Sequence, residues 1–372
     1  MPFEMMHRLV LATTLLSITL AQQTFWQESF QLNFNYDFTS NVGPNDWGNV
    51  DISNSEWDQY ANGHPLFNLD ITINECDLSF RPSPIALDVT DVCSDVEMWM
   101  RQVDSTDCVA KDVSFEIAPH TLRAYFPDDD TTCQRPHLEL DGSGSDPYIL
   151  QWMEIHARSE HVVNGRRFDA ELQMVHMGTA SSNQKMVIVS ILIDASARGD
   201  HVEFQYMLDQ WKTAADALSS KCGSSRRSLR TRDTDATSPI HQSTHIDDDV
   251  KPPRRTQQCT GSNCGPRVKM YPYSMWPSIW YYKYRGSLTT PPCATIVNWR
   301  ILDKPMTISR KQYKQLAALL TAYKNSACVD ATALSPTGEN FRPLATINTN
   351  FQSVTHCTRD DFTETLYDPG FQ

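Results

Sequence analysis

Hydrophobic and polar residues alternate in short runs over most of the chain from about residue 25 to 221, and Asn, Asp, Pro and Gly separate the runs. This period-two alternation is typical of β-strands that bury one face. The clearest predicted strands are 122–126, 138–140, 149–152 and 186–192. Because the last run is nearly all apolar, it is predicted to be a central strand buried on both faces.

Helical periodicity is confined to two stretches, residues 204–218 and 309–322. The predicted fold class is therefore mainly β with short helices (α+β). Between the two helices, residues 222–269 carry basic clusters, an Asp triplet and prolines, but too few large apolar side chains to build a core. We interpret this stretch as a surface insertion in one domain spanning residues 25–372. It is either a flexible solvated loop or a site of recognition, anion binding or processing at its dibasic steps.

The composition is typical of a folded protein rather than a disordered one. A chain of 372 residues with 40% hydrophobic content and nine Trp can bury a large core. Its net charge of −13 at pH 7 repels phosphate backbones and gives no reason to expect a nucleic-acid partner.

The first residues have the pattern of a targeting segment. A basic pair precedes an apolar run from Leu9 to Leu20, so residues 1–21 are predicted to be a signal peptide cleaved after Ala21. A transmembrane anchor is disfavoured because the run is shorter than the roughly 20 residues that a spanning helix needs. No later stretch of the sequence qualifies as a transmembrane segment. The protein is expected to be secreted through the endoplasmic reticulum, or to reach another compartment on that route.

Ten cysteines accompany this leader, an even number that favours disulfides in an oxidising compartment. Their spacing does not fix the pairing. No two of them form a CxxC pair, so a structural zinc site built from thiolates is disfavoured. The insertion could be tied down through Cys222, Cys259 or Cys264.

One segment of the chain carries a family signature. Residues 284–293 read Tyr-Arg-Gly-Ser-Leu-Thr-Thr-Pro-Pro-Cys and precede Trp299, and this run resembles the most specific signature of the α-carbonic anhydrases. Further segments fall in family order between about residues 36 and 348: 43–48, 82–85, 119–122, 159–165, 170–172 and 340–344. The resemblance implies the α-carbonic anhydrase fold, one domain around a central twisted, largely antiparallel ten-stranded sheet with the active site in a cone. It also implies a disulfide between Cys76 and Cys293 that fixes the loop with the Thr-Thr-Pro-Pro turn.

The resemblance places the zinc ligands on residues that are not all histidine. The family chemistry uses three neutral imidazoles around Zn²⁺, with an open fourth position for water. The first two ligand positions, two residues apart on one strand, fall on Glu154 and His156, and the third falls on Gln173. A carboxylate lowers the net charge at the ion and an amide is a poor zinc donor, so zinc binding is expected to be weak or absent.

Two alternatives would keep a metal at the site. A mixed site of Glu154, His156 and Gln173 would bind zinc with slower turnover at neutral pH. A shifted register would recruit His161 or His176. Each of these lies an odd number of residues from a ligand position, and an odd shift turns a strand side chain to the opposite face, which argues against the shift.

The residues around the ligand positions match the family more closely. By resemblance, Thr289 orients the zinc-bound hydroxide and Glu160 accepts its proton. His120 matches the proton shuttle, and Glu171 matches the residue that orients the third ligand and can accept a hydrogen bond from the amide of Gln173. The expected substrate pocket consists of Val175, Ile188, Leu288, Thr290 and Trp299. Thr289 and Glu160 could also only brace the fold, and His120 could be a solvated surface histidine.

Three functions are compatible with this mixture. The leading hypothesis is a secreted carbonic-anhydrase-like protein with weak or no CO₂ hydration, which acts as a binding or scaffold module for an unknown protein partner. The alternative is a functional carbonic anhydrase with an altered or weak metal site, whose substrates are CO₂ and bicarbonate. A matrix or biomineral role is the third, and the lack of acidic repeats counts against it.

Overall fold

The computed structural model describes most of the chain in segments. These are residues 33–53, 69, 71–78, 80–88, 91–93, 100–103, 112–127, 134–140, 147–178, 186–232 and 272–358. The predicted signal peptide at 1–21 and the insertion beyond residue 232 lie outside the described residues. The same is true of Cys108, Cys133, Cys259 and Cys264.

The described residues form fourteen strands in two sheets. The small sheet consists of β1 (Ala86–Leu87), β7 (Val162–Val163) and β8 (Arg166–Arg167). The strands of the large sheet are β2 (Arg101–Val103), β3 (Ser114–Ile117), β4 (Leu122–Tyr125), β5 (His137–Glu139), β6 (Tyr148–His156), β9 (Ala170–Gly178), β10 (Met186–Ala197), β11 (Tyr281–Gly286), β12 (Val297–Leu302), β13 (Met306–Ser309) and β14 (Thr355–Cys357).

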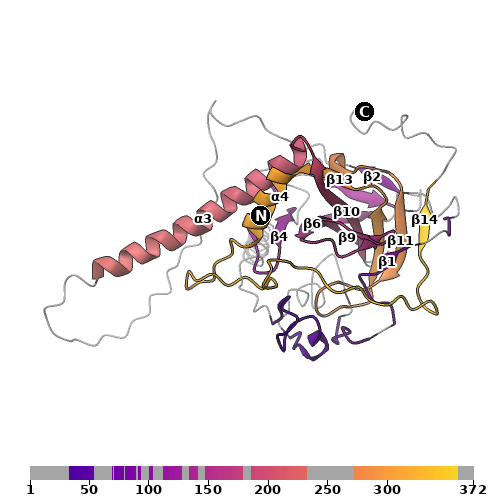
Figure 1. Cartoon of the computed structure of the whole chain (residues 1–372), viewed down its shortest axis with the longest axis horizontal. Coiled ribbons are helices and arrows are strands. Elements are labelled where there is room, and N and C mark those ends of the chain that lie inside the picture. The colour runs from indigo at the N-terminus through magenta and orange to yellow at the C-terminus, as the bar shows by residue number, and fades with distance from the viewer. Residues whose placement is uncertain are drawn as a thin grey trace, which may run out of the picture.

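The large sheet is curled and forms the centre of the molecule (Figure 1). Its main path runs β14-β11-β12-β10-β9-β6-β4-β3, with β13, β2 and β5 attached beside it. Neighbouring strands are antiparallel, except that β12 and β13 run parallel to β10. The predicted fold class, mainly β with short helices around a largely antiparallel sheet, is confirmed. The sheet has eleven strands in the described part of the chain, rather than the ten that the resemblance implied.

The predicted central strand is β10, and it is longer than its apolar run. It lies between β9 and β12 and also pairs with β13, so its neighbours cover both of its edges. Its first ten residues are all buried. β-branched residues dominate this stretch, and they pack well on a pleated surface that is covered on both faces.

Within the described part of the chain, two α-helices lie on one side of the sheet, α3 (Val202–Arg232) and α4 (Arg310–Leu320). Helix α4 matches its prediction, because Ser309 caps it and exchanges hydrogen bonds with Gln312 in a capping box. Helix α3 is longer than predicted and projects beyond the sheet (Figure 1). A helix shows apolar periodicity only where it packs on a core. The periodic pattern in the sequence therefore ends where α3 leaves the sheet. Among the described residues, no helix is long and apolar enough to cross a membrane.

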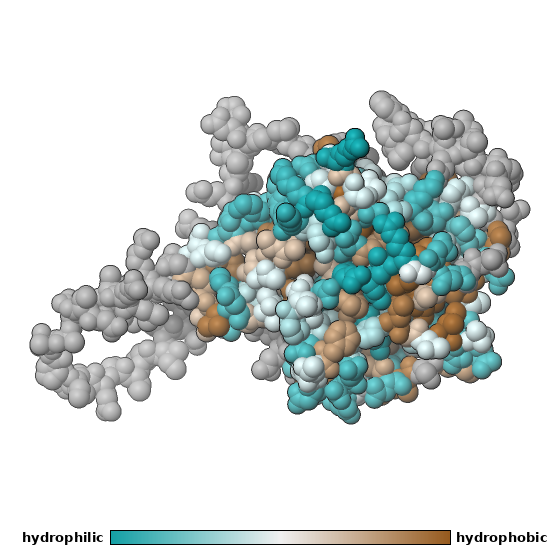
Figure 2. Space-filling view, viewed as in Figure 1, coloured by the Kyte–Doolittle hydropathy of each residue, from teal (hydrophilic) through white to brown (hydrophobic). Residues whose placement is uncertain are grey.

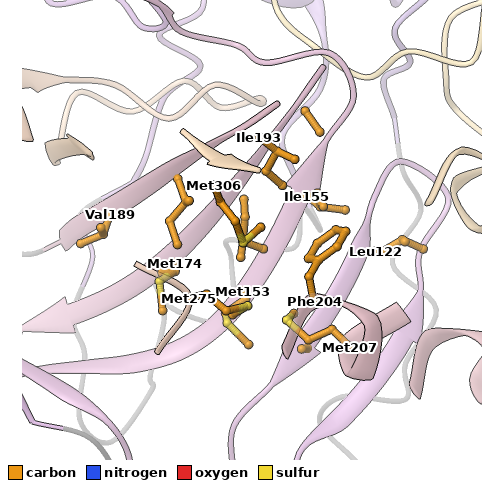
Figure 3. Packing of buried hydrophobic residues seen from close by; sticks show 14 of the residues in the cluster. Leu122, Met153, Ile155, Met174, Val189, Ile193, Phe204, Met207, Met275 and Met306 are labelled. Carbon is orange, nitrogen blue, oxygen red and sulfur yellow. The ribbon is translucent and has the colours of Figure 1, made fainter. Parts of the chain in front are cut away.

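Alternation along the strands divides the core into two main clusters on opposite faces of the sheet. On the helix side, Leu122 and Ile155 meet Phe204 between the sheet and α3 (Figure 3). The other face carries Trp152, Val175, Ile188 and Trp299, among others. The residues at the expected ligand positions follow this second alternation and therefore lie on the face away from the helices.

A third, aromatic cluster covers part of that second face. Phe34 packs edge-on against Trp47 with ring centroids 5.4 Å apart, and Tyr36, Val50 and Cys293 complete the cluster. Trp47 belongs to a short 3-10 helix, η1 (Trp47–Asn49), and a second one, η2 (Pro272–Met275), precedes β11. The N-terminal segment therefore packs over the region where the family has its cone.

Three disulfides join described residues that are distant in sequence. Cys76 bonds to Cys293, and the remaining bridges are Cys93–Cys357 and Cys222–Cys328. The Cys222–Cys328 bridge ties α3 to the segment that follows α4. The predicted insertion is therefore anchored at its start, where residue 222 is still helical.

The surface is polar over most of the face in view, with hydrophobic residues interspersed (Figure 2). The large exposed hydrophobic residues include Phe80 and Phe351, whose rings pack against one another with centroids 4.3 Å apart. Arg81 stacks over the Phe80 ring and donates a hydrogen bond to the backbone oxygen of Phe351.

Candidate functional site

Two adjacent strands carry the expected ligand positions, and a third strand places an arginine beside them. Glu154 and His156 lie two residues apart on β6, and Gln173 on β9 is directly opposite Glu154 in the antiparallel register. On the other side of β6, Arg123 of β4 is the register partner of Glu154. All four side chains are buried. The row Arg123–Glu154–Gln173, with His156 beside it, is the centre of the candidate site.

Arg123 and Glu154 form a buried ion pair within this row. Arg123 Nε donates to Glu154 Oε2 at 2.8 Å, and Trp152 Nε1 donates to the same oxygen at 3.1 Å. The two charged side chains are only 7% and 8% exposed. Burial opposes the ionised carboxylate, but the guanidinium of Arg123 and the imidazole of His156 hold the pKa of Glu154 well below its usual value. Glu154 is therefore a carboxylate whose charge is already neutralised by the protein.

His156 is oriented by a backbone carbonyl and directs its other nitrogen into the site. Its Nδ1 lies 2.7 Å from the carbonyl oxygen of Asn340, to which it donates. Its Nε2 is buried, has no hydrogen-bond partner among the described residues, and lies 3.7 Å from Glu154 Oε1. Burial lowers the pKa of His156, but the nearby carboxylates of Glu160 and Glu154 outweigh it and raise that pKa to about 9.

Gln173 is held by two carboxylates through its amide nitrogen. Nε2 donates to Glu160 Oε2 at 2.8 Å and to Glu171 Oε1 at 3.2 Å, so the hydrogen bond expected between Gln173 and Glu171 is present. Glu171 also accepts from Ser190 Oγ at 2.7 Å. Burial raises the pKa of Glu171, but the charge and hydrogen bonds of His161 outweigh it and hold that pKa at about 2.

The two histidines considered for a shifted register lie outside the ligand row. His161 is placed between Glu171 Oε1 and the hydroxyl of Tyr284, at 2.8 and 2.7 Å. His176 Nδ1 contacts the backbone oxygen of Met174 at 2.9 Å, and its Nε2 contacts the hydroxyl of Tyr273 at 3.0 Å. Both are bound in structural networks, so neither completes a histidine triad.

The loop after β11 carries Thr289, which is buried beside Leu288 and Thr290. Glu160, its expected partner, accepts from Gln173 through Oε2 and from the backbone N–H of Arg342 through Oε1 at 3.0 Å. Within the described chain, the carboxylate of Glu160 thus accepts hydrogen bonds from these two donors rather than from Thr289. Its role as a proton acceptor for Thr289 stays a prediction.

His120 is buried, with only 3% of its surface exposed, and is not a solvated surface residue. The ring of Phe34 lies edge-on to it at 5.5 Å, and its Nε2 lies 3.3 Å from Arg123 Nη2. The N-terminal aromatic cluster, which sequence periodicity did not place, covers the histidine. A proton shuttle needs contact with bulk water, and this packing restricts that contact.

The expected apolar pocket residues gather on the same face of the sheet. Val175 and Ile188 are register partners on β9 and β10. Leu288 and Trp299 belong to the same cluster, and Trp299 Nε1 anchors the loop after β11 by donating to the Ser287 carbonyl at 3.0 Å. The disulfide between Cys76 and Cys293, whose Cα atoms lie 4.8 Å apart, ties this loop to the N-terminal part of the chain.

Two residues of the site were not identified from the sequence. Arg123 lies in a strand whose neighbours are apolar, and a charge in such a strand requires a buried partner. Glu154 is likewise a charged residue in the largely apolar strand β6. Two charges of opposite sign in apolar strands were therefore the signal that the sequence offered for an ion pair. Asn340 was recognised only as part of a family segment. It orients His156 and also donates to the His120 and Ile155 carbonyls.

The residues present do not fit a zinc ion. One oxygen of Glu154 accepts from both Arg123 and Trp152, and Gln173 could offer a metal only its neutral amide oxygen, which is a poor donor for zinc. A guanidinium beside the carboxylate adds a positive charge where a cation would bind. At the three expected ligand positions, His156 is the one imidazole, and its Nε2 has no hydrogen-bond partner among the described residues. This arrangement supports no catalytic step through a metal.

The curled sheet and the segments packed on it define an α-carbonic anhydrase fold. Residues 70–230 and 247–353 match the family described as eukaryotic-type carbonic anhydrase. Because this match covers well over half of the chain, the chain belongs to that family.

Individual relatives bear two kinds of name. The chain is 24% identical over 335 residues to alpha carbonic anhydrase 7 of Arabidopsis thaliana, covering 89% of this chain and 93% of that protein. It is 25% identical over 314 residues to dioscorin DB3L of Dioscorea polystachya, covering 82% of this chain and 83% of that protein. Among solved structures, a hyperthermostable carbonic anhydrase from a hydrothermal vent chimney aligns with a TM-score of 0.50 at 16% identity, over 87% of this chain and all of that one. This structural likeness concerns the fold alone.

Proposed function

We propose that this chain is a secreted carbonic-anhydrase-like protein that uses its fold as a binding or scaffold module and has weak or no CO₂ hydration activity. The observation that carries the proposal is the Arg123–Glu154 ion pair in the ligand row, at 2.8 Å. Family membership by itself leaves the activity open, because the similar proteins include carbonic anhydrases and a dioscorin.

A guanidinium lacks the property by which a zinc ion catalyses CO₂ hydration, the ability to bind and ionise a water molecule. Zinc ionises a bound water near neutral pH because it accepts a lone pair at an open coordination position. The guanidinium of Arg123 offers only N–H donors and has no such position. It can orient an oxygen atom by hydrogen bonding, but it cannot generate a hydroxide nucleophile at pH 7.

A second candidate function, CO₂ hydration at an altered metal site, is favoured by one specific observation. Among the described residues His156 Nε2 has no hydrogen-bond partner, and Glu171 accepts a hydrogen bond from Gln173 at the third expected ligand position. In that case the substrates would be CO₂ and bicarbonate, and turnover would be slow because Glu154 and Gln173 are poorer ligands than imidazoles.

Secretion is part of the proposal and is supported by the disulfides. Three bridges join described cysteines, and disulfides persist mainly in proteins that pass through an oxidising compartment. The partner of a secreted scaffold would be an extracellular protein. N-terminal sequencing of the secreted product tests the predicted cleavage after Ala21, and retention of residues 1–21 in a cell-associated product would contradict it.

The proposed lack of activity is tested by stopped-flow CO₂ hydration with the purified mature protein in zinc-containing buffer. We expect a rate at or only slightly above that of a sample whose protein has been heat-denatured. Zinc-dependent hydration well above that control, abolished by a sulfonamide, would establish the second candidate function instead.

A further inference from the structure

The buried guanidinium of Arg123 occupies a position that the loss of two histidines does not by itself explain. We propose that Arg123 is the residue that excludes divalent cations from the cone, so that restoring the histidines alone would not restore zinc binding. This inference rests on the proposed function, because it assigns a cause to the weak or absent zinc binding proposed for the same site.

Charge is the first reason. Arg123 is the direct register neighbour of Glu154, and its Nε lies 2.8 Å from Glu154 Oε2. A divalent ion bound at the ligand positions would share this carboxylate with the guanidinium at close range. A guanidinium and a divalent ion that contact the same carboxylate repel one another. This repulsion weakens binding of the ion by about 100-fold or more, even at an effective dielectric constant near 20.

The second reason is that Glu154 is not the only group that holds Arg123 in place. Its Nη1 donates to the hydroxyl of Tyr125 at 3.2 Å, and its Nη2 lies 3.3 Å from His120 Nε2. The guanidinium also lies over the ring of Trp152, 5.6 Å from the centroid. Replacing Glu154 by histidine would remove one contact and leave these three, so the charge would stay beside the ligand positions.

The third reason is that the Arg123 side chain is buried and cannot move its charge into solvent when a metal ion binds. The Arg123 side chain is 7% exposed, and its backbone oxygen accepts a 2.7 Å hydrogen bond from Trp211 Nε1. The strand is therefore fixed against the helix-side core, while the guanidinium is enclosed on the other face. A metal ion would have to bind with the guanidinium present.

The test compares zinc affinity in two restored proteins. One carries Glu154→His with Gln173→His, and the other adds Arg123→Gln. Each is titrated with Zn²⁺ in competition with a chromophoric chelator, and Co²⁺ absorption reports whether four-coordinate binding occurs. We expect the triple variant to bind one equivalent and to exceed the affinity of the double variant by about 100-fold or more.

A matched control separates a local effect of Arg123 from a general loss of buried charge. Arg300 is also buried in the sheet, and it alternates with Trp299 and Ile301, so it lies on the opposite face from the ligand row. Adding Arg300→Gln to the double variant should leave zinc affinity unchanged. Near-ultraviolet circular dichroism verifies that every variant is folded, and Arg123→Met replaces Arg123→Gln if the first triple variant is not.

The outcomes distinguish this inference from the proposed function. Stoichiometric, tight zinc binding by the double variant with Arg123 intact would overturn the role of Arg123, and so would equal affinities in folded double and triple variants. Neither result bears on whether the unaltered protein hydrates CO₂, which the stopped-flow assay decides separately.

Discussion

Arg123→Met removes one partner of the buried ion pair and keeps most of the side-chain volume against Trp152. Glu154 Oε2 then retains only the Trp152 donor, in a site where the carboxylate side chain is 8% exposed. Stranding one charge of a buried pair costs about 3–5 kcal/mol. Because His156 Nε2 lies 3.7 Å from the other oxygen and offsets part of the loss, we expect a decrease in the free energy of unfolding of about 3 kcal/mol at pH 7.

The measurement is equilibrium urea denaturation with the disulfides intact, at pH 7 and at lower pH. The effect should shrink as the pH falls, because the stranded carboxylate can then take up a proton. Arg101→Met is the matched control, since Arg101 pairs with Glu139 at 3.3 Å but is 64% exposed, and its loss should cost at most about 1 kcal/mol. If Arg123→Met and Arg101→Met destabilise the protein equally, the ion pair between Arg123 and Glu154 is not a buried pair of the kind described.

Two further predictions concern residues around the row. Gln173→Leu leaves Glu160 and Glu171 without a shared donor and should lower the free energy of unfolding by about 2 kcal/mol in urea denaturation; no loss would contradict the network. Burial lowers the pKa of His176 from 6.5 to about 3. Below pH 6.5, His176 is therefore protonated in the unfolded chain but still neutral in the folded protein. Between pH 6.5 and about pH 3, this group therefore lowers the free energy of unfolding by about 1.4 kcal/mol for each unit that the pH falls. The dependence should be weaker in His176→Gln, and an unchanged pH profile would refute the assignment.

The fold could largely be predicted, because its strands either alternate apolar and polar residues or consist of continuous apolar runs. β10 and α4 follow directly from their periods, whereas the full length of α3 does not, because its projecting part has no core to face. The register between β4 and β6 also leaves no trace in the spacing of residues. Arg123 and Glu154 lie 31 positions apart in sequence. Their contact depends on that register.

The candidate site shows the same division between local and long-range information. Glu154, His156 and Gln173 could be placed through the resemblance, because the family pattern is local to two strands. The burial of His120 could not, since it depends on Phe34, which packs across the sheet from a segment far away in sequence. Charge pairing and aromatic covering both arise from tertiary packing.

Zinc titration of the unaltered mature protein tests most directly the claim that an internal ion pair has taken the place of the metal. Isothermal calorimetry with Zn²⁺, followed by metal analysis after dialysis, measures both affinity and stoichiometry. We predict no saturable binding in the cone and well below one equivalent of retained zinc. One equivalent of tightly bound zinc that is lost on His156→Ala, in a folded protein, would contradict the account.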